Sequence, residues 1–251
     1  MFTRISDHYK NSTAVVIGAG GIGDAIVQLL SGQVAKLVVG DRDQRLLDAL
    51  TPQVGTELVR RKIDVSDAAS VRDFFAYCSQ HAGSPQFLFY TAGILNLESL
   101  ADTTPALWDT AVDINLNGAF YCTHAAMELM IPQQQGSILL LGSIAGTRAR
   151  SGSRVNPVYN TTKAAVSAFV NAAAMQLRPH GVRINCISPG PTATAMMDLQ
   201  PKQVHAAISE IALDRRQNSP IEVAELALFV AAHGRFTGED VGLGGGAGLG
   251  G

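Results

Sequence analysis

The fold of this chain is decided by the stretch Ala14-Val15-Val16-Ile17-Gly18-Ala19-Gly20-Gly21-Ile22-Gly23. Its first four residues form a short apolar run, which is typical of a buried β-strand. Three glycines follow at the spacing G-x-G-x-x-G, and residues 24–30 after them are mostly apolar and favour a helix. A strand, a glycine-rich turn and a helix in this order predict the first unit of an α/β fold with a parallel sheet.

The glycine-rich turn also predicts a dinucleotide site. Gly18 permits the tight turn, Gly20 lets a pyrophosphate approach the backbone, and Gly23 lets the helix pack on the strand. The N-terminus of that helix offers free N–H groups and a positive dipole end to the phosphates. We therefore assign Gly18, Gly20, Gly21, Ile22 and Gly23 to a cofactor site. The alternative is a tight turn that binds nothing.

The second predicted strand, residues 36–40, ends at Asp41. A carboxylate at this point can accept hydrogen bonds from both ribose hydroxyls of NAD, and it repels the 2′-phosphate of NADP. Arg42 could pair with that phosphate instead, so NAD is predicted and NADP is the alternative. Asp41 and Asp43 lack a third ligand, so no metal site is predicted.

Tyr159 and Lys163 are a candidate catalytic pair. They lie four residues apart in the segment Pro157-Val158-Tyr159-Asn160-Thr161-Thr162-Lys163. Four residues make about one helical turn, so both side chains leave the same face of the predicted helix. A phenol has a reference pKa of about 10, and a nearby ammonium lowers it by stabilising the phenolate. The pair could exchange a proton with an alcohol or a carbonyl; a solvated helix face is the alternative.

Together with the glycine turn and Asp41, this pair resembles the short-chain dehydrogenase/reductase family in its single-domain form. Further segments of the chain follow the family pattern in the same order. They are Asp64-Val65, Ala92-Gly93, Asn115 in Asp113–Gly118, Gly136–Ser143, Arg183–Pro191 and Phe236-Thr237-Gly238. The resemblance implies a Rossmann-type, doubly wound parallel sheet of about seven strands with helices on both faces. It also implies one catalytic domain over residues 1–251, with a substrate lid at about 191–219 and a Gly-rich tail at 242–251.

The resemblance implies hydride transfer between NAD(H) and a secondary alcohol or ketone. Tyr159 would be the proton donor and acceptor, and Lys163 would lower its pKa and hold the nicotinamide ribose. Ser143 would bind the same substrate oxygen, and Asn115 would position a water that links Lys163 to solvent. By the same resemblance, the cofactor site gains Arg42, Asp64, Val65, Ala92, Gly93, Pro189, Gly190, Thr192 and Thr194, besides Tyr159 and Lys163.

The chain departs from the family pattern in ways that bear on the site. The glycine turn is one residue shorter than the usual Thr-Gly-x-x-x-Gly-x-Gly, with Ile17 in place of the Thr, which leaves the pyrophosphate pose open. Tyr90-Thr91 replaces an Asn-Asn pair, and we expect the central strands to lose an amide that helps to hold them. Gly142 replaces the first Ser of a common Ser-Ser pair, which leaves Ser143 as the hydroxyl at that point.

The segment between Ser143 and Tyr159 holds three arginines: Arg148, Arg150 and Arg154. One of them could grip a carboxylate, phosphate or sulfonate on the substrate with two parallel hydrogen bonds. Alternatively, all three face solvent or pair with acids of a neighbouring subunit. The predicted lid contains no recognisable substrate code, so the identity of the substrate is not readable.

Composition limits the function classes. Hydrophobic content is 47% and charged content only 16%, which favours extensive subunit contacts and, with the resemblance, a homotetramer or homodimer. A net charge of −2 gives no electrostatic reason to expect nucleic acid or membrane as a partner. The scattered Cys78, Cys122 and Cys186 are typical of reduced core residues in a cytoplasmic protein. The tail from Gly242 is too rich in glycine to hold a strand well, and we expect it to order only against a partner subunit.

Two other functions stay open. An NADP-dependent carbonyl or 3-oxoacyl reductase is the alternative if Arg42 outweighs Asp41. A protein of another class, which senses nucleotides or acts as a scaffold on this fold without catalysis, is the second. Turnover of any secondary alcohol with NAD would decide against the second.

Overall fold

The computed structural model describes residues 5–147, 156–198 and 212–247. Its centre is a seven-stranded sheet in the order β3-β2-β1-β4-β5-β6-β7, and every neighbouring pair is parallel. The strands are β1 Thr13–Ile17, β2 Lys36–Asp41, β3 Glu57–Lys62, β4 Phe87–Tyr90, β5 Gly136–Leu141, β6 Val182–Pro189 and β7 Asp240–Leu243. The strand order reverses between β1 and β4. This topology confirms the predicted Rossmann-type, doubly wound sheet.

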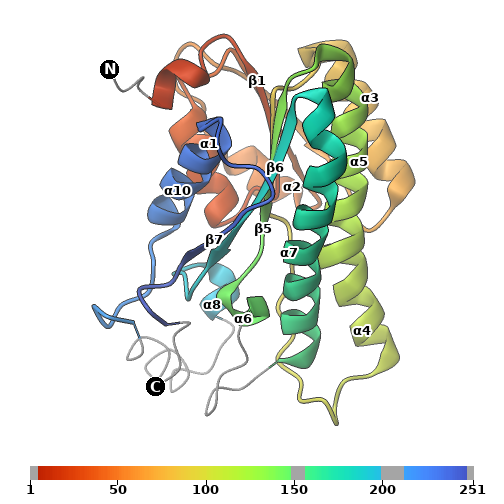
Figure 1. Cartoon of the computed structure of the whole chain (residues 1–251), viewed down its shortest axis with the longest axis vertical. Helices are drawn as coiled ribbons and strands as arrows, with labels where there is room; N and C mark the ends of the chain where they lie inside the picture. The colour runs from red at the N-terminus through yellow and green to blue at the C-terminus, as the bar shows by residue number, and fades with distance from the viewer. Residues whose placement is uncertain (1–4, 148–155, 199–211, 248–251) are drawn as a thin grey trace.

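Helices cover both faces of the sheet, as Figure 1 shows. The longer helical elements are α1 Ile22–Leu30, α2 Gln44–Ala49, α3 Ala68–Ala82, α4 Pro105–Val112, η2 Asp113–Asn117, α5 Gly118–Met130, α7 Pro157–Leu177 and α10 Pro220–Ala232. The short ones are η1 Ile5–His8, η3 Ile131–Gln133, α6 Ile144–Thr147, η4 Arg178–His180 and α8 Ala195–Asp198. The helices α1 and α10 lie on one face, and α3, α5 and α7 lie on the other.

The residues of β1 alternate between two apolar cores. Val15 and Ile17 pack in the core under α3, α5 and α7, whereas Ala14 and Val16 pack in the core under α1 and α10. All residues of β1 are buried, as expected for a central parallel strand with helices on both faces. The glycine turn that follows this strand therefore starts from a rigid position in the middle of the sheet.

The chain from Pro105 to Met130 is helical, with one interruption. The Thr104 side chain accepts a hydrogen bond from the backbone N–H of Leu107 at 3.3 Å, so it caps α4. Between α4 and α5 the chain makes a π-helical turn, η2, which contains Asn115. Such turns occur mostly as single bulges within α-helices and often at functional sites. The sequence pattern did not predict this one.

The expectation for the Gly-rich tail was wrong. Gly242 and Leu243 belong to β7 and pair with Ser188 and Pro189 of β6 within the same subunit. The backbone carbonyl of Leu243 also accepts hydrogen bonds from Gly190 N at 2.7 Å and from Asn218 Nδ2 at 2.8 Å. Here the glycines allow close backbone approach, since a Cβ on Gly190 would lie 2.9 Å from Gly244 Cα. Residues 248–251 lie outside the described part.

The structure bears on two possible partners, a membrane and a metal ion. Within the described ranges, no helix has both the length and the apolar composition needed to cross a bilayer. Likewise, no cluster of three or more His, Cys, Asp or Glu side chains in that part of the chain could hold a metal ion.

Candidate active site

A cavity of about 1270 Å³ lies at the carboxyl ends of the central strands. Ligands of open α/β sheets bind in this position, where the strand order reverses. Of the predicted site residues within the described ranges, all line the cavity except Gly23 and Asn115. The three arginines of the predicted anion clamp, Arg148, Arg150 and Arg154, lie outside those ranges, as do residues 199–211 of the predicted lid.

The glycines of the turn have different surroundings. Gly18 has a positive φ of 101°, and a Cβ there would lie 2.7 Å from Thr91 Oγ1. A Cβ on Gly23 would lie only 1.8 Å from the carbonyl oxygen of Gly18, so this residue lets helix α1 pack against the turn. A Cβ on Gly20 would meet only the Leu46 side chain, at 3.5 Å. Gly20 therefore borders open cavity space, where a pyrophosphate could approach the backbone.

Thr91 holds the turn to β4 and corrects one expectation. Its hydroxyl lies 3.0 Å from the Ile17 carbonyl oxygen and 3.1 Å from that of Gly18, and its N–H donates to Ile17 O at 2.8 Å. The Tyr90 hydroxyl donates to Ile114 O at 2.6 Å and joins β4 to η2. The amide lost with the Asn-Asn pair is thus replaced by two hydroxyl groups, and the central strands stay connected.

Asp41 is bonded to the shortened turn, which the sequence did not predict. Its Oδ2 accepts a hydrogen bond from Ala19 N at 2.7 Å, and its Oδ1 accepts one from Asp43 N at 2.8 Å. A carboxylate has about four lone-pair positions, so acceptor capacity for ribose hydroxyls remains. Arg42 is exposed next to it. The hydrogen bonds from Ser66, with a smaller contribution from the Arg42 charge, lower the pKa of Asp64.

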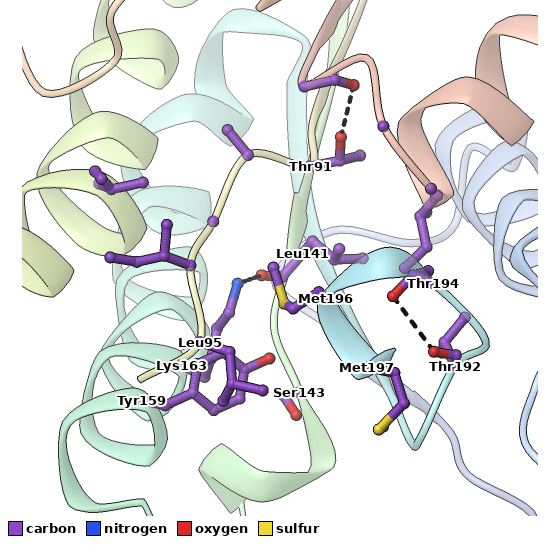
Figure 2. Close-up of a pocket in the computed structure, with 18 of the residues that line it drawn as sticks. Thr91, Leu95, Leu141, Ser143, Tyr159, Lys163, Thr192, Thr194, Met196 and Met197 are labelled. Atoms are coloured by element: carbon purple, nitrogen blue, oxygen red, sulfur yellow. Dashed lines mark hydrogen bonds between the residues drawn. The ribbon is translucent and has the colours of Figure 1, made fainter. Parts of the chain in front are cut away.

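The candidate catalytic side chains meet at one wall of the cavity. Ser143 follows β5, and Tyr159 and Lys163 lie one turn apart on α7, so the three converge from two elements (Figure 2). Asn156 caps α7, because its side chain accepts a hydrogen bond from Tyr159 N at 2.9 Å. The Lys163 ammonium donates to Leu141 O at 2.8 Å and lies 5.7 Å from the centroid of the Tyr159 ring.

Burial dominates the electrostatics of this pair. It lowers the pKa of Lys163 to about 8, because a charged ammonium is disfavoured away from water. It raises the pKa of Tyr159, and the Ser143 hydroxyl offsets part of this rise. Sequence reasoning expected Lys163 to lower the pKa of Tyr159. In the structure the residue that lowers it is Ser143.

The low pKa of Lys163 predicts a pH dependence of stability. Between pH 8 and about 10.5, the unfolded chain retains the Lys163 proton and the folded chain has lost it. The free energy of unfolding due to this residue should therefore rise with pH by at most about 1.4 kcal/mol per unit. The contribution is fully present above pH 10.5 and is lost as pH falls through 8.

Chemical denaturation of the wild type and of Lys163→Met at pH 7 and pH 9 measures this difference. The comparison matters because burial raises the pKa values of Cys78 and Cys186 to about 12, and such thiols lower stability above pH 9 in both proteins. A difference between the two proteins that is independent of pH would contradict the prediction.

Asn115 lies behind the cavity rather than in its wall. It is 1% exposed, and its Oδ1 accepts a hydrogen bond from Ile94 N at 2.8 Å. Its Nδ2 donates to Ile94 O at 3.0 Å and to Thr162 Oγ1 at 3.1 Å. The side-chain amide thus joins the segment after β4 to α7 and keeps one acceptor position on Oδ1.

The segment after β6 packs on the glycine turn. A Cβ on Gly21 would lie 2.9 Å from Thr194 Cγ2, and the Thr194 hydroxyl donates to Thr192 O at 3.4 Å (Figure 2). The base of the predicted lid is fixed by backbone bonds, from Ala193 N to Asn218 O at 2.9 Å and from Leu213 N to Gly245 O at 2.7 Å. Pro189 and Gly190, at the end of β6, line the same cavity.

Sequence reasoning missed several cavity residues. Leu95 follows the Ala92-Gly93 pair, and Met196 and Met197 lie on α8; none carries a chemical signature that a motif could reveal. Asn156 did carry a signal, because an Asn followed by Pro at the start of a helix is a typical N-cap. The capping function explains its position directly before the catalytic turn.

Comparisons with known proteins agree with this geometry. The family model described as enoyl-(acyl carrier protein) reductase matches residues 17–247. An uncharacterized oxidoreductase of Staphylococcus aureus (strain USA300) is 30% identical over 221 residues, which cover 87% of this chain and 90% of the relative. A short-chain type dehydrogenase/reductase from Mycobacterium marinum has a TM-score of 0.89 at 26% identity, with 97% of this chain and 98% of that chain covered. A 3-oxoacyl-[acyl-carrier protein] reductase from Brucella melitensis has a TM-score of 0.85 at 26% identity, with 98% and 96% covered.

Proposed function

Because this chain belongs to the short-chain dehydrogenase/reductase family and is an oxidoreductase, we propose that it transfers a hydride between NAD(H) and a secondary alcohol or ketone. The observation that carries the proposal is the convergence of Ser143, Tyr159 and Lys163 at one wall of the cavity beside the glycine turn. Residues 1–251 act as one catalytic domain, with the base of a substrate lid after β6.

The residues around the cavity fit a nicotinamide dinucleotide. The open space at Gly20 suits a pyrophosphate, Asp41 retains acceptor capacity for ribose hydroxyls, and Lys163 lines the same cavity, where it would hold the nicotinamide ribose. The remaining holding residues are Gly18, Gly21, Ile22, Arg42, Asp64, Val65, Ala92, Gly93, Pro189, Gly190, Thr192 and Thr194. When bound, the cofactor supplies or accepts the hydride.

The protein residues handle the proton and the orientation of the substrate. Tyr159 gives its hydroxyl proton to a carbonyl oxygen, or as phenolate takes one from an alcohol. Ser143 binds the same oxygen and stabilises the phenolate. Lys163, fixed by Leu141 O, places a positive charge near the ring. Asn115 acts through position, because its amide braces the segment after β4 against α7.

A panel of secondary alcohols, sugars, steroids and hydroxy acids, assayed for NAD reduction, tests the proposed function. Reduction of NAD by at least one class supports it. If the chain binds NAD, oxidises none of these compounds and, with NADH, reduces no ketone, the second class of function, a nucleotide-sensing or scaffold protein, replaces it.

The chain should bind NAD at least tenfold more tightly than NADP. Asp41 lies at the end of β2 with free lone pairs, and its charge opposes a 2′-phosphate. Calorimetric titration with both cofactors measures the ratio. Asp41→Ala should reduce the difference between the NAD and NADP affinities. It should also weaken the binding of both cofactors, since it frees the Ala19 N–H that anchors the turn. Tighter binding of NADP would overturn the assignment.

One observation favours a second candidate, an NADP-dependent 3-oxoacyl or carbonyl reductase. Arg42 is exposed beside Asp41 at the cavity, where a guanidinium can pair with the 2′-phosphate. The similarity to a 3-oxoacyl-[acyl-carrier protein] reductase points the same way. Arg42→Ala separates the candidates: a large loss of NADP affinity with NAD affinity unchanged would favour this second function.

The chain forms a homotetramer or at least a homodimer. Large apolar side chains are exposed on α4, α5 and α7: Trp108 is 39% exposed, Phe120 46% and Met175 65%. The Phe120 ring meets the edge of Phe169, with centroids 6.1 Å apart, so an aromatic surface joins α5 and α7. Light scattering should give two or four times 26.4 kDa. A monomeric mass at micromolar concentration would contradict this.

The protein acts in the cytoplasm on a small molecule. Cys78, Cys122 and Cys186 are all buried and unpaired, which suits a reducing compartment. No feature of the charge distribution favours nucleic acid as a partner.

A further inference from the structure

The cavity wall beside the candidate catalytic group is apolar on two sides. Leu95, from the segment after β4, lies by the Tyr159 ring (Figure 2), and Met196 and Met197 of α8 line the same cavity. Ile144 of α6 also lines the cavity. Leu95, Met196 and Met197 are only partly buried, so a ligand between these elements would remove more of their apolar surface from water.

Charge in this part of the cavity does not favour an anionic ligand. Among the described lining residues, the Lys and Arg side chains are Lys163, which is bonded to Leu141 O, and Arg42, which lies at the other end beside β2. Two carboxylates, Glu98 and Asp102, line the cavity on the same segment as Leu95. These two carboxylates would repel a negatively charged group on the substrate.

We propose that the substrate carries a neutral apolar group on the carbon next to the reacting one, held between Leu95 and Met197. This inference rests on the proposed function, since it places the reacting oxygen at Tyr159 and Ser143. The two side chains come from different elements, so they can contact the substrate from opposite sides. The unbranched thioether of Met197 adapts to ligands of different shape, which suits an alkyl or aryl group better than one fixed outline.

Three ketones with the same reacting group test the clamp: 2-butanone, 4-phenyl-2-butanone and the anionic 4-oxopentanoate. Their binding to the NADH-loaded Tyr159→Phe variant is measured by calorimetry or NMR titration, so the readout does not depend on turnover. The substitutions are Leu95→Ala and Met197→Ala in that background. Matched controls are Leu100→Ala and Leu213→Ala, because these side chains are 72% and 92% exposed and do not line the cavity.

The phenyl ketone should bind roughly a hundredfold more tightly than 2-butanone, given the apolar area that it buries. Each clamp substitution should lower that preference about tenfold and change 2-butanone binding little; the controls should change neither. Equal binding of the two neutral ketones would overturn the clamp. So would an equal loss of affinity for all three ketones in the Leu95→Ala and Met197→Ala variants. Tightest binding of 4-oxopentanoate would overturn it too and would support the arginine segment 148–154 instead.

Turnover in the wild type separates this inference from the proposed function. If the binding preference and its loss occur as described but no ketone is reduced, the proposed reaction fails and the apolar clamp stands. If ketones are reduced without any preference for the phenyl compound, the clamp fails and the reaction stands.

Discussion

Replacement of Tyr159 by Phe should lower kcat by roughly 10²–10⁴, the usual range for loss of an acid/base group. The change removes one hydroxyl and keeps the ring, whose centroid lies 5.7 Å from Lys163 Nζ. The Asn156 cap bonds the backbone of residue 159 and not its side chain, so the helix should be unaffected. The affinity for NAD and the unfolding midpoint should therefore stay close to those of the wild type.

Tyr77→Phe is the matched control for this experiment, since Tyr77 lies on α3 and stacks on His81 outside the cavity. Steady-state kinetics on any substrate found in the panel, together with NAD titration and thermal melting, gives the three quantities. Turnover of the Phe variant at the wild-type rate would remove Tyr159 from the mechanism.

The pH profile of the same reaction gives a second test. Alcohol oxidation requires the phenolate, and burial raises the pKa of Tyr159. The rate of alcohol oxidation should therefore rise with pH across the neutral and alkaline range, and this rise should disappear in Tyr159→Phe. A rate that falls from neutral to alkaline pH while the protein remains folded would assign the limiting proton transfer to another group.

Local patterns predicted the parts of the fold that depend on neighbours in sequence. The turn Gly18–Gly23 follows directly from its strand, and Tyr159 and Lys163 share a helix face because they lie one turn apart. In each of these cases the distance along the chain is short, so sequence periodicity and capping residues determine the geometry.

The parts that escaped prediction depend on residues far apart in the chain. Asp41 bonds Ala19 across 22 positions, and Thr91 bonds Ile17 across 74; neither pairing leaves a trace in local composition. The strand at Gly242 forms because β6 offers its open edge, which outweighs the poor strand propensity of glycine. The pKa of Tyr159 also escaped, since it depends on burial that only the tertiary structure defines.

Substitution by Ala should destabilise the fold at Gly23 and leave its stability nearly unchanged at Gly20. Gly23→Ala adds a Cβ that would lie 1.8 Å from the Gly18 carbonyl oxygen. Because Gly23 lies in helix α1, intrinsic propensity alone would favour Ala by about 1 kcal/mol. The clash involves rigid backbone, and overpacking of this kind costs about 1–3 kcal/mol or more. A clash with rigid backbone lies at the upper end of that cost, so after the propensity gain we expect net destabilisation of about 2 kcal/mol, with loss of NAD binding.

Gly20→Ala should leave the fold intact and still impair the cofactor site. Its Cβ would meet only Leu46 Cδ1, at 3.5 Å, which is an ordinary contact, so the unfolding free energy should change by less than about 0.5 kcal/mol. The same methyl group projects toward the space where a pyrophosphate would approach, and NAD affinity should fall at least tenfold. Denaturant unfolding and calorimetric NAD titration of both variants separate packing from binding. Wild-type NAD affinity in Gly20→Ala would show that the shortened turn holds the pyrophosphate elsewhere, and wild-type stability of Gly23→Ala would contradict the close packing of α1 on the turn.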